Sequence, residues 1–171
     1  YGPKGIGALY IRQQPRVRIA PLSFGGGQEW GVRAGTLATH QIVGMGAACA
    51  LAQKEMSADL VQVTALAKIL GDGIKSLPGI KILADGPHRY PGCINLQFAD
   101  LDAETVLAAL ADFALATGSA CNSAQPQVSH VLLAMGLSRQ QAASCIRCSI
   151  GRNTTIEAIR ALLRAIKALL M

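Results

Sequence analysis

Cys121 stands in a segment of small and hydroxylated residues, 116–124, with no bulky apolar neighbour for several positions on either side. A cysteine in a hydrophobic core is usually surrounded by large apolar side chains, where it behaves as a small inert hydrophobe. A thiol on a loop of small residues is instead presented to solvent, as a catalytic nucleophile has to be. A plain turn with an incidental cysteine fits the same residues, so the local pattern leaves both interpretations open.

Arg147 is a second residue that could take part in binding or catalysis. It lies in the middle of the run 145–150, whose period-2 alternation predicts a strand. A guanidinium in such an apolar strand needs an anion, and its planar fork fits a carboxylate. The anion is either a bound substrate or an internal acidic residue, and the internal salt bridge is the commoner case.

A glycine run at residues 25–27 is followed, at residues 33–36, by the sequence Arg-Ala-Gly-Thr. A glycine-rich loop that ends at a hydroxyl on a helix N-terminus can hold a phosphate. Thr36 or Thr39 is the expected cap of the helix that follows. A hinge loop between two domains accounts for the same residues.

The elements that must position these residues follow from periodicity. Alternating strands and long helices predict an α+β fold, in which helices cover one face of a small sheet. Residues 1–36 are expected to be the tail of a larger domain, and residues 37–171 to form a small domain that begins with the linking helix. Strands are predicted at 5–11, 80–83, 93–98 and 145–150, with a further short strand at 113–117. Helices are predicted at 36–75, 102–112, near 128–135, near 139–144 and at 155–170. The first helix has a possible break near Ser57, and Asp102 is the expected cap of the second.

Composition narrows the class of protein. Of the 171 residues, 51% are hydrophobic and 15% are charged, which is typical of a packed globular domain. The net charge of +6 is spread along the chain, apart from the cluster Arg12, Arg16 and Arg18. No aromatic interleaving or nucleic-acid-reading motif accompanies the basic residues, so we expect no direct nucleic-acid partner.

Cysteine usage indicates a reducing compartment. The five cysteines are an odd number in a chain of ordinary size, so a disulfide framework is not expected. Cys145 and Cys148 form a lone CxxC, and on the predicted strand they face opposite ways, which disfavours a metal site. No apolar run is long enough to span a membrane, and we expect a cytoplasmic protein without a membrane partner.

Five motifs in this order resemble the NifS/IscS-like cysteine desulfurases, which are pyridoxal-phosphate enzymes of aminotransferase class V. They are Tyr-Gly-Pro-Lys-Gly-Ile-Gly at 1–7, Gly-Gly-Gly-Gln-Glu at 25–29, Arg-Ala-Gly-Thr at 33–36, Gly-Ser-Ala-Cys at 118–121 and Ile-Arg-Cys-Ser-Ile-Gly-Arg at 146–152. The resemblance covers the whole chain. It implies the small C-terminal domain of a fold-type I enzyme, together with the tail of the large domain.

The resemblance also implies roles for single residues. Cys121 would attack the sulfur of L-cysteine, which leaves L-alanine and a cysteine persulfide on the enzyme. Arg147 would hold the substrate carboxylate, and Thr36 would reach the pyridoxal 5'-phosphate of the partner subunit in a homodimer. The persulfide would supply sulfur-acceptor and iron–sulfur scaffold proteins, for cluster assembly and tRNA thiolation.

One departure from the family pattern bears on activity. In the family, the lysine that carries the cofactor lies just before the stretch that matches 1–5, and Lys4 matches a different, structural lysine. The chain is therefore expected to be the C-terminal half of a desulfurase, without the anchoring lysine, and inactive alone. Two alternatives stay open: a stand-alone sulfur-carrier or partner-binding module, and an enzyme like selenocysteine lyase.

Overall fold

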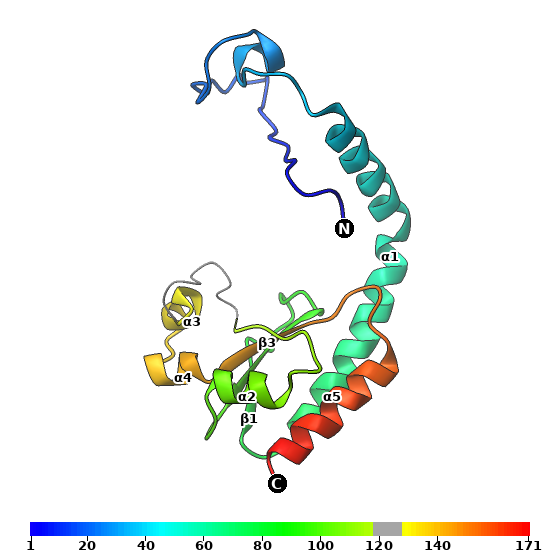
Figure 1. Ribbon diagram of the computed structural model, residues 1–171, viewed down its shortest axis with the longest axis vertical. Coiled ribbons are helices and arrows are strands. Elements are labelled where there is room, and N and C mark those ends of the chain that lie inside the picture. The colour runs from blue at the N-terminus through cyan, green and yellow to red at the C-terminus, as the bar shows by residue number, and fades with distance from the viewer. Residues whose placement is uncertain (118–127) are drawn as a thin grey trace. The chain divides into compact units, whose positions relative to one another are not determined.

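The computed structural model describes residues 1–117 and 128–171 (Figure 1). These residues divide into two compact units, 1–56 and 57–171. The long helix α1 (Thr39–Lys75) begins in the first unit and ends in the second. It is continuous, and the unit boundary falls at Ser57, where the sequence suggested a break. The domain boundary at residue 36 stays a prediction.

The second unit is built on a three-stranded antiparallel sheet. Its strands are β1 (Ile80–Leu83), β2 (Cys93–Phe98) and β3 (Cys145–Ser149), in the order β1-β2-β3. The predicted strands at 80–83 and 93–98 are confirmed with their bounds, and the third ends one residue earlier than predicted. The α+β class is therefore confirmed.

Several of the shorter helices, but not α3 (His130–Ala134), begin at a residue whose side chain caps them. The Asp102 carboxylate accepts a hydrogen bond from the Thr105 backbone N–H at 2.7 Å, which fixes the start of α2 (Ala103–Ala109). Thr155 caps α5 (Ile156–Leu169) through the Ala158 N–H at 3.2 Å. α3 and α4 (Arg139–Ala143) follow, and Ser138 forms a capping box at α4.

Buried and partly buried side chains alternate along β2 and show which face of the sheet is buried. Ile94, Leu96 and Phe98 are buried, whereas the residues between them are only partly buried. The buried face packs against α2, α5 and the C-terminal half of α1, which lies beside α5 in Figure 1. These helices contribute the buried residues Val63, Leu66, Leu70, Ile74, Val106, Ile159, Leu162 and Ile166.

A smaller cluster lies on the other face of the sheet, at one end. Leu83 and Cys145 from the strands pack there with Leu132 of α3 and Ala142 of α4. Helices thus contact both faces, although the larger core is on one. Much of the remaining second face carries polar side chains, and this is the face that bears Arg147.

The first unit is loop-rich. It contains the 3-10 helix η1 (Gln28–Gly31) and the N-terminal half of α1. The predicted strand at residues 5–11 is wrong, because this segment has an irregular backbone. A strand needs a neighbour for its backbone hydrogen bonds, and the three named strands of the described residues all lie in the second unit. No helix in the described parts of the chain is both long and apolar enough to cross a membrane.

Candidate functional site

Arg147 lies at the centre of β3, on the sheet face opposite the larger core. Its Cα partner on β2 is Asn95, whose own partner on β1 is Leu83. On its other side Arg147 pairs with Ala116 in an isolated antiparallel bridge. The row Leu83–Asn95–Arg147–Ala116 therefore runs across the whole sheet on one face. Arg147 is partly buried in it.

Two backbone hydrogen bonds fix Ala116 to β3. The Arg147 N–H donates to the Ala116 carbonyl oxygen at 2.6 Å, and the Ala116 N–H donates back to the Arg147 carbonyl oxygen at 3.2 Å. The strand expected at 113–117 is thus reduced to this single bridge. Cys121 lies outside the described residues, so its predicted loop stays a prediction. The chain that leads toward it, however, is attached to the strand of Arg147.

The guanidinium of Arg147 has no acidic partner in residues 1–117 and 128–171. Ion pairs in these residues join, among others, Lys68 with Asp72, Lys75 and Arg89 with Asp85, and Arg152 with Asp59, and Arg147 takes part in none. Residues 118–127 contain no Asp or Glu. An internal carboxylate therefore does not account for this arginine, and its fork of donors is available to an external anion.

The two cysteines of the CxxC face opposite ways, as the strand period predicted. Cys145 belongs to the smaller cluster and Cys148 to the larger core. Burial raises the pKa of the Cys145 thiol. Burial, with a smaller contribution from Cys93, raises the pKa of Cys148 to about 12. Both thiols are therefore protonated at neutral pH and are poor nucleophiles.

No metal site is found in the part of the chain that the structure describes, where no cluster of three His, Cys, Asp or Glu side chains is placed to hold an ion.

Sequence reasoning missed one residue of interest. Asn95 was not singled out, because its place opposite Arg147 depends on the register of two strands that are distant in sequence.

The loop before α1 is held by its own side chains. The Arg33 guanidinium donates to the carbonyl oxygens of Gly35 at 3.1 Å and Thr36 at 3.4 Å. The Gly35 N–H donates to the side chain of Gln28 at 3.0 Å. Gly35 has φ +111, a conformation that favours glycine. α1 begins at Thr39, so Thr36 precedes the helix rather than capping it, and its side chain is exposed.

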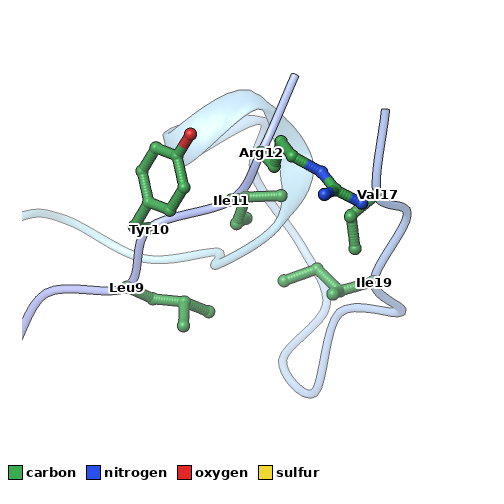
Figure 2. A pocket seen from close by; sticks show the side chains of 6 residues that line it. All are labelled: Leu9, Tyr10, Ile11, Arg12, Val17 and Ile19. Carbon is green, nitrogen blue, oxygen red and sulfur yellow. The ribbon is translucent and has the colours of Figure 1, made fainter. Parts of the chain in front are cut away.

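An open apolar hollow of about 320 Å³ lies elsewhere in the first unit. Figure 2 shows Ile19 facing Leu9 and Ile11 across it, whereas the ring of Tyr10 points away. The lining is aliphatic and aromatic apart from Arg12, which donates to the Pro15 carbonyl oxygen at 3.2 Å. The hollow contains no acidic group and no thiol, so it is not a candidate for catalysis.

Comparison with known proteins identifies the family. Residues 1–162 match the family model described as Aminotransferase class-V, and the chain belongs to this family. It is 49% identical over 167 residues to "Cysteine desulfurase IscS" of Colwellia psychrerythraea, an alignment that covers 98% of this chain and 41% of that protein. It is 51% identical over 160 residues to human "Cysteine desulfurase", covering 93% of this chain and 35% of the human protein.

Solved structures agree with this assignment. A protein described as "NIFS-LIKE PROTEIN" superposes with a TM-score of 0.83 at 31% identity, over 99% of this chain and 43% of that one. A NifS-like protein from Rickettsia africae superposes with a TM-score of 0.79 at 28% identity, over 90% and 40% of the two chains. The present chain thus spans about two fifths of the length of these relatives.

Proposed function

We propose that the full-length protein containing this chain is a cysteine desulfurase, which converts L-cysteine to L-alanine and retains the sulfur on Cys121 as a persulfide. Relatives about half identical to this chain carry that name. The observation that carries the proposal within the chain is Arg147. This residue is partly buried, its guanidinium has no carboxylate partner in residues 1–117 and 128–171, and it lies on the strand to which the segment leading to Cys121 is hydrogen-bonded.

Arg147 binds the α-carboxylate of the substrate in this proposal. A guanidinium offers two parallel donors to the two carboxylate oxygens, so it fixes the orientation of the amino acid as well as its charge. The backbone N–H and carbonyl of this residue both bond to Ala116, and β3 as a whole pairs with β2 on its other side. The donor is therefore pre-positioned, and binding orders little besides the side chain.

Cys121 is the proposed sulfur acceptor. Its thiolate attacks the substrate sulfur, so that a sulfur–sulfur bond forms while the carbon–sulfur bond of the substrate breaks. Five residues of chain lead from Ala116 to Cys121, and such a stretch spans at most about 18 Å. The hydrogen-bonded bridge between Ala116 and Arg147 therefore limits how far the thiol can be from a substrate held by Arg147.

Pyridoxal 5'-phosphate, when bound, supplies the electron sink for the carbon that loses sulfur. In this chain Thr36 is the residue proposed to bind the cofactor phosphate. Its hydroxyl is exposed, and Arg33 and Gln28 hold the backbone around it. The Thr36 hydroxyl could therefore serve as one hydrogen-bond donor of a phosphate site. The remaining ligands, and the lysine expected before residue 1, would come from the rest of the protein.

The partners follow from the same proposal. Thr36 would serve the cofactor of a partner subunit, so we propose a homodimer, and the persulfide would pass to sulfur-acceptor and iron–sulfur scaffold proteins. We propose a cytoplasmic location. One relative, from Arthroderma benhamiae, is named "Cysteine desulfurase, mitochondrial", so the location varies among proteins with this name.

The experiment uses the full-length protein with Cys121→Ser and, as the matched control, Cys49→Ser, which alters an exposed thiol of the first unit. The proposal expects alanine formation from L-cysteine to fall at least about a hundredfold in the first variant, because hydroxyl oxygen cannot accept sulfur, and to be unchanged in the second. Equal activity of the Cys121→Ser variant and the wild type would refute the desulfurase mechanism. Alanine formation only from selenocysteine would favour the lyase alternative.

A further inference from the structure

The register of the sheet places Asn95 beside Arg147 on the same face. The two residues are Cα partners on β2 and β3. Asn95 is partly buried, between the fully buried Ile94 and Leu96 that point into the larger core. Residues that are directly opposite on an antiparallel pair share a face. Asn95 and Arg147 therefore project together from the side of the sheet that the larger core leaves free.

The pair has the closer of the two spacings that an antiparallel sheet allows. The N–H and the carbonyl of Arg147 both bond to Ala116, so neither is directed at β2. Hydrogen-bonded pairs of the same register lie an odd number of residues away, as just beyond the strands, where the Ile150 N–H donates to the Gly92 carbonyl at 2.8 Å. In such a non-hydrogen-bonded pair the Cα atoms are about 4.5 Å apart, against about 5.5 Å in a hydrogen-bonded pair.

Neither side chain has a polar partner in the described residues. No hydrogen bond to the Asn95 carboxamide and no ion pair of Arg147 is formed in residues 1–117 and 128–171. Their neighbours in the row are Leu83 and Ala116, which offer no charge and no side-chain hydrogen bond. The polar atoms of both side chains are open to solvent, because neither residue has a buried side-chain atom without a partner. The row thus holds one cation and one neutral donor, both unused.

We propose that Asn95 is a second carboxylate-binding residue, whose Nδ2 donates a hydrogen bond to an oxygen of the amino-acid carboxylate held by Arg147. This inference rests on the proposed function and deepens it. The two oxygens of a carboxylate accept about four hydrogen bonds, and the arginine fork uses two. A carboxamide adds a donor without adding a charge. The pair therefore selects substrates that carry an α-carboxylate.

The test uses the full-length protein with Asn95→Leu, which keeps the approximate size and removes the donor. Gln97→Leu is the matched control, because Gln97 is the next residue on the same face of β2 and lies opposite Cys145 rather than Arg147. We expect KM for L-cysteine to rise about tenfold in Asn95→Leu with kcat little changed, and to stay within twofold in Gln97→Leu. Asn95→Asp is expected to raise KM further, because its carboxylate would pair with Arg147.

A second readout does not depend on turnover. L-alanine, the product, should raise the melting temperature of the wild type and of Gln97→Leu by binding the folded state. Ethylamine, which lacks the carboxylate, should not. The shift produced by L-alanine should be largely lost in Asn95→Leu. If the leucine variant does not fold, Asn95→Ser provides the same comparison with a smaller side chain.

The outcomes separate this inference from the proposed function. A KM for Asn95→Leu within twofold of the wild type, or an equal rise in Gln97→Leu, overturns the role of Asn95. Arg147→Lys is measured alongside. If it raises KM while Asn95→Leu does not, only the inference about Asn95 fails. If neither variant affects KM or the thermal shift, the carboxylate site itself fails.

Discussion

Ala116 and Arg147 are joined by two backbone hydrogen bonds of 2.6 and 3.2 Å, although 31 positions of sequence separate them. This bridge brings together the two motifs that carry the proposed chemistry. One contains the arginine that has no carboxylate partner in the described ranges, and the other leads to the cysteine at position 121. The spacing of the two motifs in the sequence does not indicate this contact, because it depends on how β3 pairs in the folded sheet.

The first prediction concerns Arg147→Lys in the full-length protein. Lysine keeps the positive charge but loses the two-pronged geometry. A hydrogen bond to a charged group contributes about 1.5–3 kcal/mol, so kcat/KM for L-cysteine should fall about ten- to a hundredfold. The melting temperature should change little, because no internal ion pair is broken among the described residues. Unchanged kinetics with a lowered melting temperature would assign Arg147 to structure.

The second prediction concerns Gly92, which is buried and directly precedes β2. A Cβ atom there would lie 2.5 Å from the Ile150 carbonyl oxygen and 2.9 Å from the Val63 side chain. Gly92→Ala should therefore destabilise the fold by roughly 1–3 kcal/mol, the usual cost of overpacking. Gly86→Ala is the control, because a Cβ there meets nothing within 4 Å. Urea denaturation compares the two, and equal stability would refute the packing at this position.

The third prediction concerns the pH dependence of stability at Asp85. A hydrogen bond and ion pair with Lys75, and further contacts with Arg89, lower the pKa of this carboxyl below its ordinary value of 3.8. The unfolded state therefore binds a proton at higher pH than the folded state does. The stabilisation is present above 3.8 and is lost as the pH falls through the lower folded pKa.

Denaturation curves in acid test this sign. The wild type should lose stability on going from about pH 5 to pH 2, and Asp85→Asn should lose less over the same range, because it has no carboxyl to protonate. At neutral pH the variant should be the less stable of the two. An identical pH profile for both proteins would show that the ion pair with Lys75 contributes nothing to the folded state.

The fourth prediction ranks the thiols by alkylation rate under native conditions. Cys148, with a pKa of about 12, and Cys145, whose pKa is raised by burial, should react only after unfolding. Cys49 is exposed and should react in the native state. We expect Cys121 to react fastest. Peptide mapping after a short treatment with iodoacetamide gives the order, and early labelling of Cys148 would contradict the packing of β3.

Local signals in the sequence predicted much of the second unit. Alternation placed β1 and β2 at their observed bounds, and Asp102 marked the start of α2 because its side chain can accept a backbone N–H group. The strand expected at residues 5–11 does not form, since an apolar run specifies a strand only where a neighbouring strand is available.

The candidate site was only partly predictable. Arg147 was noticed because a charge interrupts an apolar strand, which is a local signal. Asn95 gave no such signal, because an asparagine between two apolar residues is ordinary on a half-buried strand. Its position opposite Arg147 is a property of the pairing between β2 and β3, about fifty residues apart in the chain. Single-sequence patterns do not encode that register directly.

The most direct test of the desulfurase proposal is the location of the transferred sulfur. The full-length protein is incubated with L-cysteine, blocked with iodoacetamide without reductant, digested and analysed by mass spectrometry, while alanine is quantified in parallel. The account predicts that the peptide containing Cys121 gains one sulfur atom as alanine forms, and that the peptides with Cys49 and Cys93 do not. Alanine formation with no sulfur on Cys121, or with the sulfur on another cysteine, would contradict it.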